Sequence, residues 1–304
     1  MATTSDDRPT SACAEGGDTV VFGPYVVALV DFLGQASELA KWDFAPGNAD
    51  QSAQWFRAVQ ETVGRVIAWR GRFEECFRQG RAHGERFSQQ FSEGQPVEPR
   101  QRFDEFRKTS LHTAHFSDTL IFYSPLQNEY GYWQVANVAS MIATYGILML
   151  EALAPKTVFR GAIEVGMLSQ FPSGDPYGPS LAKAYYLEAK IADYPRIIVG
   201  PDVLSYLDAT LRNPKTDGAA TSNRNVAAIC REFITQDTDG CWIVDYLSEK
   251  LASPTTDPAL RQQVLGAARA FVQAELDRFA QAGDEKLVAR YERLLAYFRS
   301  RGVT

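Results

Sequence analysis

The stretch "HFSDTLIFY", residues 115–123, places one aspartate inside an apolar run that is typical of a β-strand. The residues after Asp118, from Thr119 to Tyr123, are β-branched, aliphatic or aromatic, and such residues favour a pleated, half-buried surface. A carboxylate in this position loses part of its hydration, which is unfavourable unless another group compensates the charge. Asp118 therefore requires a partner elsewhere in the chain.

A second aspartate, Asp31, ends the apolar run "YVVALVDFLG" at residues 25–34. If the two strands are neighbours in one sheet, Asp31 and Asp118 meet, and two like charges raise each other's pKa unless a cation neutralises them. Hard divalent cations such as Mg²⁺ or Mn²⁺ are the usual partners of paired carboxylates. The pattern thus predicts a metal site at Asp31 and Asp118. The alternative is that one aspartate is a turn residue and the other a surface charge.

The overall charge argues against some classes of partner. The chain has 304 residues and a net charge of −6, whereas a general nucleic-acid surface is normally basic. Three histidines and four scattered cysteines, without a C-x-x-C pair, argue against a structural zinc site. We expect no nucleic-acid partner and no zinc.

The apolar segments of the sequence do not indicate a membrane or secreted protein. The opening "MATTSDDRPTSACAEGGDT" has no apolar core of a signal peptide. The longest apolar run, "VANVASMIATYGILMLEALA" at 135–154, carries Asn137, Ser140 and Thr144 and is typical of a buried core helix. We therefore expect a cytoplasmic protein without a membrane span.

Periodicity along the chain predicts strands and helices in mixed order. Mixed elements without strict alternation indicate an α+β fold, a sheet with helices packed on one face. We divide the chain into a disordered tail (1–22), a main domain (23–250) with an enlarged helical segment (44–107), and a C-terminal helical extension (258–304). The expected strands are 25–34, 110–116, 118–125, 157–166, 196–199 and a hairpin of 227–236 with 241–247, and the expected helices are 135–153, one starting at Pro179 and a short one after 200.

Common catalytic motifs are missing from the sequence. It contains no G-x-x-x-x-G-K-[ST] loop, G-x-G-x-x-G, H-E-x-x-H or G-x-S-x-G motif. His112 and His115 lie near Asp118, so an acid/base role is conceivable. Without a nucleophile motif beside them, a structural or surface role is the better interpretation.

Five segments, taken in order, resemble the class III nucleotide cyclase domain, the adenylate and guanylate cyclase fold. The resemblance covers residues 25 to about 250, and it implies an antiparallel-rich sheet with helices packed on it. It further implies a homodimer with active sites at its interface and two Mg²⁺ or Mn²⁺ ions that promote attack of the ribose 3′-OH on the α-phosphate. The five segments are "VALVDFLG", "HFSDTLIFY", "FRGAIEVG", "DPYGPSLAKAYYLEAKI" and "RIIVGPDV".

The resemblance assigns the metal ligands. Asp31 matches the family's strand-ending aspartate, and Phe32 after it matches the residue that offers its backbone carbonyl. Asp118 matches the second aspartate, with Ser117 in the place of the usual glycine.

The resemblance also assigns contacts to the nucleotide. Arg160 in "RGAIEVG" matches an arginine that reaches the phosphates, and Asp175 in "DPYG" matches a position that contacts the base. Phe32 and Gly34, at the end of the first strand, are expected beside the nucleotide as well.

Two departures from the family concern catalysis. Purine cyclases use an Asn and an Arg four residues apart on the helix after the D-x-(W/Y)-G loop, where this chain has Ala182 and Tyr186. The late hairpin, where the family often has a phosphate-binding lysine, reads "QDTDG". Lys183 and Lys190 lie within a turn of Tyr186, so a lysine or a hydrogen bond from Tyr186 is the expected substitute, and the sequence leaves the choice open. Tyr186 and Lys183 are the catalytic candidates.

A third departure concerns the base. Ala114 stands where adenylate cyclases have lysine and guanylate cyclases glutamate, whereas Asp175 can accept a hydrogen bond from uracil N3–H or the cytosine amine. The pattern, including the long helical segment, resembles the bacterial pyrimidine (uridylate) cyclases of Pycsar anti-phage systems. This implies UTP, or else CTP, as substrate and a separately encoded effector that senses the cyclic product. A catalytically inactive binding or dimerisation module and a purine cyclase are the alternatives.

Overall fold

The structure is a computed structural model that describes residues 20–34, 47–92, 110–128, 131–251 and 257–303, with the side chains of 82–92 left aside. Residues 1–19 of the expected tail, and residues 44–46 and 93–107 of the expected helical segment, lie outside these ranges. The first strand already begins at Val21, so the expected boundary at residue 22 is two residues too late.

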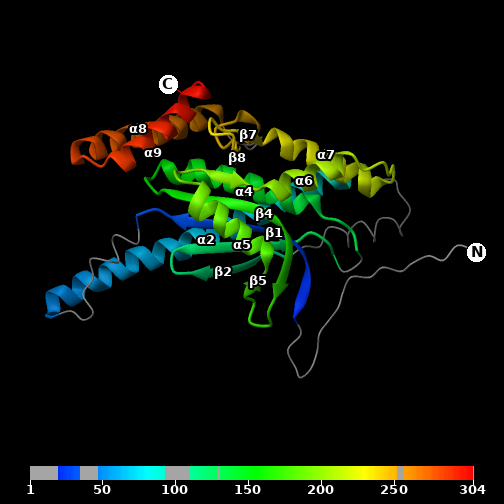
Figure 1. The fold of residues 1–304 in the computed structure, drawn as a ribbon, viewed down its shortest axis with the longest axis horizontal. Helices are drawn as coiled ribbons and strands as arrows, with labels where there is room; N and C mark the ends of the chain where they lie inside the picture. Colours follow the sequence, from blue (N-terminus) through cyan, green and yellow to red (C-terminus); the bar gives the residue numbers. More distant parts are fainter. Residues whose placement is uncertain (1–19, 35–46, 93–109, 129–130, 252–256, 304) are drawn as a thin grey trace, which may run out of the picture.

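One mixed sheet of eight strands forms the centre of the described chain (Figure 1). The strand order is β2-β3-β1-β4-β6-β8-β7, and short β5 pairs with β4. Neighbouring strands are antiparallel except for β4 and β6, which are parallel. The strands are β1 (Val21–Phe32), β2 (His112–Phe116), β3 (Thr119–Pro125), β4 (Phe159–Gln170), β5 (Pro176–Tyr177), β6 (Ile197–Val199), β7 (Ile234–Gln236) and β8 (Trp242–Val244).

Seven α-helices pack around this sheet in the described part of the chain, so the α+β class is confirmed. They are α2 (Ala49–Ser92), α4 (Val135–Leu153), α5 (Pro179–Tyr186), α6 (Pro201–Leu211), α7 (Gly218–Glu232), α8 (Pro258–Ala282) and α9 (Glu285–Ser300). A π-helical turn, η1 (Leu187–Ile191), continues α5, and a 3₁₀ turn, η2 (Glu249–Leu251), follows β8.

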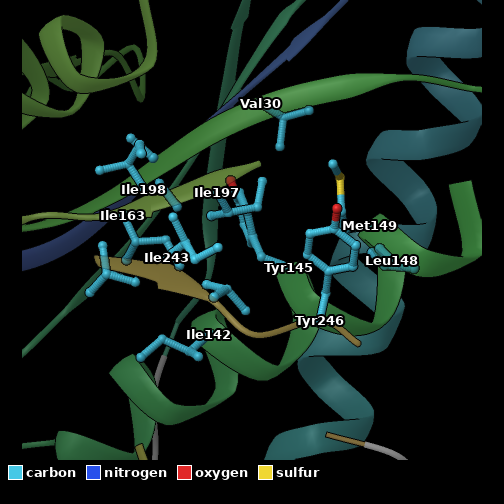
Figure 2. Packing of buried hydrophobic residues seen from close by; sticks show 14 of the residues in the cluster. Val30, Ile142, Tyr145, Leu148, Met149, Ile163, Ile197, Ile198, Ile243 and Tyr246 are labelled. Atoms are coloured by element: carbon cyan, nitrogen blue, oxygen red, sulfur yellow. The ribbon is translucent and has the colours of Figure 1, made fainter. Parts of the chain in front are cut away.

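The main core lies between one face of the sheet and helices α2 and α4. Alternate residues of β1, from Val26 to Phe32, belong to this core together with Phe73 of α2 and Tyr145 of α4. Figure 2 shows Ile142, Tyr145, Leu148 and Met149 of α4 packed among the strands. Helix α4 is long and apolar enough to cross a membrane, but 67% of its most apolar window is buried inside the protein. The described chain thus uses it as a core helix.

The opposite face of the sheet carries a smaller core under α5. Tyr25, Val27 and Leu29 of β1 pack there against Ala184 of α5. Because strand residues alternate between faces, Asp31 belongs to this second face. The expectation that helices pack on one face only is therefore wrong, since α5 and η1 cover part of the other face.

One further prediction needs correction. Residues 227–236 were expected to form a strand, but α7 continues to Glu232 and only Ile234–Gln236 is strand. The helix is favoured because Asp217 caps its N-terminus through the Ala220 amide (2.8 Å) and because buried Ala227 and Cys230 lie on one helical face.

The C-terminal helical extension consists of two helices, α8 and α9, and Gly283 ends the first of them. This glycine ends α8 with a φ of 70°, a conformation that residues with a side chain rarely adopt. The two helices contribute Leu265, Phe271, Leu294 and Phe298 to the main core cluster. The C-terminal helices are thus packed directly onto the α4 side of the sheet (Figure 1).

Candidate active site

The ends of three neighbouring strands bring the two predicted metal ligands together. In the antiparallel register, Asp31 of β1 faces Thr119 of β3 on one side and Arg160 of β4 on the other. Asp118 directly precedes Thr119, whose hydroxyl donates a hydrogen bond to Asp31 Oδ1 (3.2 Å). The carboxylates of Asp31 and Asp118 thus lie at the same end of the sheet.

The turn that carries Asp118 is a two-residue β-hairpin. Phe116 pairs with Thr119, so Ser117 and Asp118 form the turn, and Ser117 has a φ of 57°. A positive φ at the first central residue of such turns usually requires glycine. The positive φ explains why glycine is expected at the position that Ser117 occupies.

The charges at this end of the sheet repel each other. Burial, followed by the nearby charge of Asp118, raises the pKa of Asp31, whereas Arg160 and the Thr119 hydrogen bond lower it. Because the upward effects win, ionised Asp31 is less favourable here than in water. A cation bound between Asp31 and Asp118 would relieve both effects.

Arg160 lies between two acidic side chains instead of pointing to open solvent. Its Nε donates to Glu188 Oε1 at 2.6 Å, and its Nη2 lies 3.5 Å from Asp31 Oδ2. Glu188 is almost fully buried on η1, and burial raises its pKa, with Arg160 as the largest opposing effect. We call Asp31, Asp118, Arg160 and Glu188 the sheet-end cluster. Arg160 partly neutralises it, but one guanidinium faces three carboxylates.

The residues at the cluster fit a divalent ion that is held by few protein ligands. The Phe32 side chain points into the main core, where its ring lies 6.0 Å from that of Phe159, so only its backbone carbonyl can serve the site. Among the described residues, no group of three or more His, Cys, Asp or Glu side chains is arranged to hold a metal. A site of two carboxylates and one carbonyl, completed by phosphate oxygens and water, does not require such a group.

Asp175 is not brought to the sheet-end cluster within one chain. It follows Gly174, whose carbonyl accepts a hydrogen bond from the Tyr123 hydroxyl, and its own Oδ2 accepts one from Ser173 (2.7 Å). Tyr123 lies four residues beyond Thr119 on β3, roughly 13 Å along an extended strand. Burial, then Tyr25 and Asp175, raises the pKa of Tyr123 to about 12. Asp175 thus belongs to a second polar region on the same face.

The catalytic candidates lie on α5, on the surface. Lys183 Nζ forms an ion pair with Asp202 Oδ2 at 2.5 Å, and this hydrogen bond raises the pKa of Lys183. The side chain of Tyr186 is largely exposed, with 58% of its surface accessible. Gly34, in the turn after β1, has a φ of 93°, which favours glycine over other residues there. Among the described residues, neither Lys183 nor Tyr186 forms a hydrogen bond or ion pair with Asp31 or Asp118.

The two histidines near Asp118 have different surroundings. His112 stacks on Tyr123, with ring centroids 5.1 Å apart, and its Nδ1 is 3.1 Å from Gln170 Nε2. Burial lowers its pKa, which suits a packed, neutral ring. His115 is exposed on β2. A structural role for His112 therefore accounts for its contacts.

Sequence reasoning missed two buried glutamates, Glu188 and Glu164. Glu164 of β4 is fully buried, and its Oε1 accepts hydrogen bonds from the amides of Val165 (2.9 Å) and Val203 (3.1 Å). The signal that singled out Asp118, an acidic residue in an apolar run, was also present in "RGAIEVG" and would have found Glu164. Glu188 lies in "YYLEAKI", a pattern that also suits an exposed helical residue.

The late hairpin, where a phosphate-binding lysine was missing, has a different role. Asp237 and Asp239 of the β7–β8 turn form ion pairs with Arg196, which precedes β6. The turn therefore binds a cationic side chain through two carboxylates, where the family would have a lysine.

Comparison with models of known protein families, with curated proteins and with solved structures found no match for this chain.

Proposed function

We propose that this chain is a nucleotide cyclase of the class III type, which converts UTP to 3′,5′-cyclic UMP and diphosphate. CTP is the alternative substrate. The proposed enzyme acts in the cytoplasm as a homodimer with two Mg²⁺ or Mn²⁺ ions. Its product would be a signal in anti-phage defence that a separately encoded effector senses.

The observation that supports this proposal most is the meeting of Asp31 and Asp118 at one end of the sheet. Two aspartates 87 positions apart in the chain are brought together by the pairing of β1 with β3. Burial and mutual repulsion raise the pKa of Asp31, so the pair destabilises the fold as long as nothing neutralises it. Such a feature suits a binding site for a cation better than it suits a structural role.

The protein side chains have distinct tasks in this proposal. Asp31, Asp118 and the Phe32 carbonyl would hold the ions, which when bound activate the 3′-OH and stabilise the leaving diphosphate. Arg160 keeps Glu188 as its counter-ion when Asp31 is neutralised, and its remaining N–H groups are then available to a phosphate oxygen. Asp175 would accept a hydrogen bond from the base, and in a homodimer it can face the metal site of the second chain.

Lys183 is the candidate for the positive charge that would replace the family's arginine in this chain. Lys183 is engaged by Asp202, and the late hairpin is acidic. Both observations favour the second candidate, a cyclase-like module that binds or dimerises without turnover. For Lys183 to act on substrate, its ion pair with Asp202 has to open, which costs little because both side chains are exposed and water screens the pair.

The decisive experiment is to incubate the purified protein with ATP, GTP, CTP and UTP separately in the presence of Mn²⁺. Mass spectrometry then detects any cyclic monophosphate. We expect cyclic UMP, or cyclic CMP, as the main product. A cyclic purine product would support the purine cyclase, and no product from a folded dimer would support the inactive module.

Two variants locate the activity in the proposed site. Asp118→Ala should abolish turnover while light scattering still shows a dimer, because Asp118 is only partly buried in a turn and belongs to neither core. The matched control is Asp277→Asn on α8, where the carboxylate only accepts a hydrogen bond from Gln273 (2.9 Å), and it should be fully active. Activity retained by Asp118→Ala would contradict the metal assignment.

A further inference from the structure

Glu188 of the sheet-end cluster lies on an unusual helical turn. In η1 the amide of Ala192 bonds to the carbonyl of Leu187 (2.8 Å), one residue farther than in an α-helix. Such π-turns are rare and occur frequently at functional sites. The wider turn places Glu188 in the interior, where it meets Arg160 Nε at 2.6 Å. The position of Glu188 thus depends on the shape of this turn.

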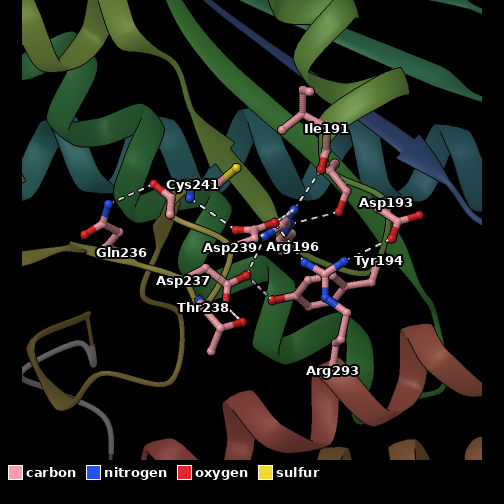
Figure 3. Close-up of polar contacts among 12 residues, drawn as sticks. Ile191, Asp193, Tyr194, Arg196, Gln236, Asp237, Thr238, Asp239, Cys241 and Arg293 are labelled. Atoms are coloured by element: carbon pink, nitrogen blue, oxygen red, sulfur yellow. Dashed lines mark hydrogen bonds and ion pairs between the residues drawn. The ribbon is translucent and has the colours of Figure 1, made fainter.

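The end of the turn is held by one buried arginine. Arg196, with 1% of its side chain accessible, donates from Nε to the Ala192 carbonyl (2.9 Å) and from Nη2 to the Ile191 carbonyl (2.7 Å). Its guanidinium is fixed in turn by Asp237 and by Asp239, the latter at 2.7 Å (Figure 3). The carbonyls that a helix normally leaves open at its end are therefore bound here by a side chain from outside the helix.

The residue after the turn is held by the C-terminal helix. Asp193 has a φ of 51°, a left-handed conformation that Asp tolerates better than most residues. Arg290 Nη2 (2.9 Å) and Arg293 Nη1 (3.1 Å) of α9 both bind its carboxylate. Arg293 Nη2 also binds Asp239 (2.8 Å), so one guanidinium joins Asp193 to the β7–β8 turn (Figure 3).

We propose that helix α9 positions the metal site through two of its arginines: the ion pairs of Arg290 and Arg293 with Asp193 fix η1, and η1 holds Glu188 and Arg160 at that site. Arg290, Arg293 and Asp193 are positioning residues, because none of them reaches Asp31 or Asp118. The inference rests on the proposed cyclase function and gives the C-terminal extension a role in it.

A second anchor on the same helix distinguishes this role from simple attachment. Arg301, at the end of α9, pairs with Asp245 (Nη2–Oδ2, 3.0 Å) beyond β8, away from η1. Both anchors tie α9 to the rest of the protein through arginine–aspartate pairs, and their arginines are similarly exposed (36% for Arg293 and 31% for Arg301), although Asp245 is more buried than Asp193. Only the anchor at Asp193 adjoins the turn that carries Glu188.

The test compares Asp193→Asn and the double variant Arg290→Ala/Arg293→Ala with Arg301→Ala in the full-length protein. Asn keeps the tolerance for a positive φ, so Asp193→Asn removes the ion pairs without straining the backbone. We call Asp193→Asn and Arg290→Ala/Arg293→Ala the clamp variants, because both remove the ion pairs between α9 and Asp193. We expect both to lower kcat roughly tenfold with little change in KM, as loss of outer-shell partners does at metal sites. Arg301→Ala should lower the melting temperature but leave kcat unchanged.

Hydrogen–deuterium exchange gives a readout that does not require turnover. The peptide covering Leu187–Ala192 should lose protection in the clamp variants and keep it in Arg301→Ala. Equal loss of kcat in all three variants, or unchanged protection of that peptide in the clamp variants, would overturn the positioning role. If the wild-type protein makes no cyclic product, the proposed function fails, and the exchange experiment still decides whether α9 fixes η1.

Discussion

Replacing Glu164 by glutamine should change how the stability of the protein depends on pH. Burial, with a smaller contribution from Asp202, raises the pKa of Glu164 from 4.5 to about 7, and two backbone hydrogen bonds oppose the rise. Oε1 accepts both of these bonds, while Oε2 has no partner among the described residues. The carboxyl is therefore protonated in the folded protein over a range in which it is ionised in the unfolded chain.

The sign and size of the effect follow from this difference. Between pH 4.5 and about 7 the folded state binds a proton that the unfolded state has lost, so the free energy of unfolding falls as pH rises. At about 1.4 kcal/mol per pKa unit, the full loss is about 3 kcal/mol above pH 7. Glutamine keeps the acceptor for the Val165 and Val203 amides and does not titrate. Glu164→Gln should thus equal the wild type near pH 4.5 and exceed it by about 3 kcal/mol at pH 8.

Urea denaturation of both proteins at pH 4.5, 6 and 8 measures the difference. Comparison with the wild type at each pH cancels the other titrating groups, and Glu292→Gln, at an exposed position on α9, serves as the control for a glutamate replaced on the surface. A difference between Glu164→Gln and wild type that is constant from pH 4.5 to 8 would refute the argument from burial.

Two further predictions concern the candidate site. Ser117→Gly should stabilise the protein by about 0.5–1 kcal/mol, because glycine adopts the positive φ of this turn without the cost that serine bears, and thermal unfolding would reveal an unchanged or lower stability if the turn is not strained. Asp31→Asn should leave the metal-free protein as stable as wild type or more so, because the raised pKa of Asp31 marks its ionised form as unfavourable in the folded state. In the same variant Mn²⁺ should no longer raise the melting temperature, whereas Mn²⁺ at 100 times its Kd should add about 2.7 kcal/mol to the wild type. A metal-induced shift that survives in Asp31→Asn would place the ion elsewhere.

Local patterns in the sequence were sufficient for the elements that build the site. The apolar runs around Asp31 and Asp118 predicted β1, β2 and β3, and Pro179 predicted the start of α5. These predictions hold because strand and helix periodicity is a property of neighbouring residues. Residues 227–232 were misassigned because a short apolar run suits a buried helix as well as a strand.

Other predictions stay untested by the fold. The cyclase activity, its substrate, the metal ions and the homodimer remain proposals that rest on the resemblance and on the sheet-end cluster. The structure adds to them the register between β1 and β3, which brings Asp31 and Asp118 to one end of the sheet.

The α+β class and the presence of two aspartates in apolar strands follow from the amino-acid sequence alone, because hydrophobic periodicity and turn residues act over a few positions. Which charges meet depends instead on how the whole chain packs. Arg160 lies against Glu188 at 2.6 Å although 28 residues separate them, and Arg293 reaches Asp193 across 100 residues. Such contacts depend on sheet register and helix packing, which arise from the burial of many side chains at once, and no local pattern specifies them.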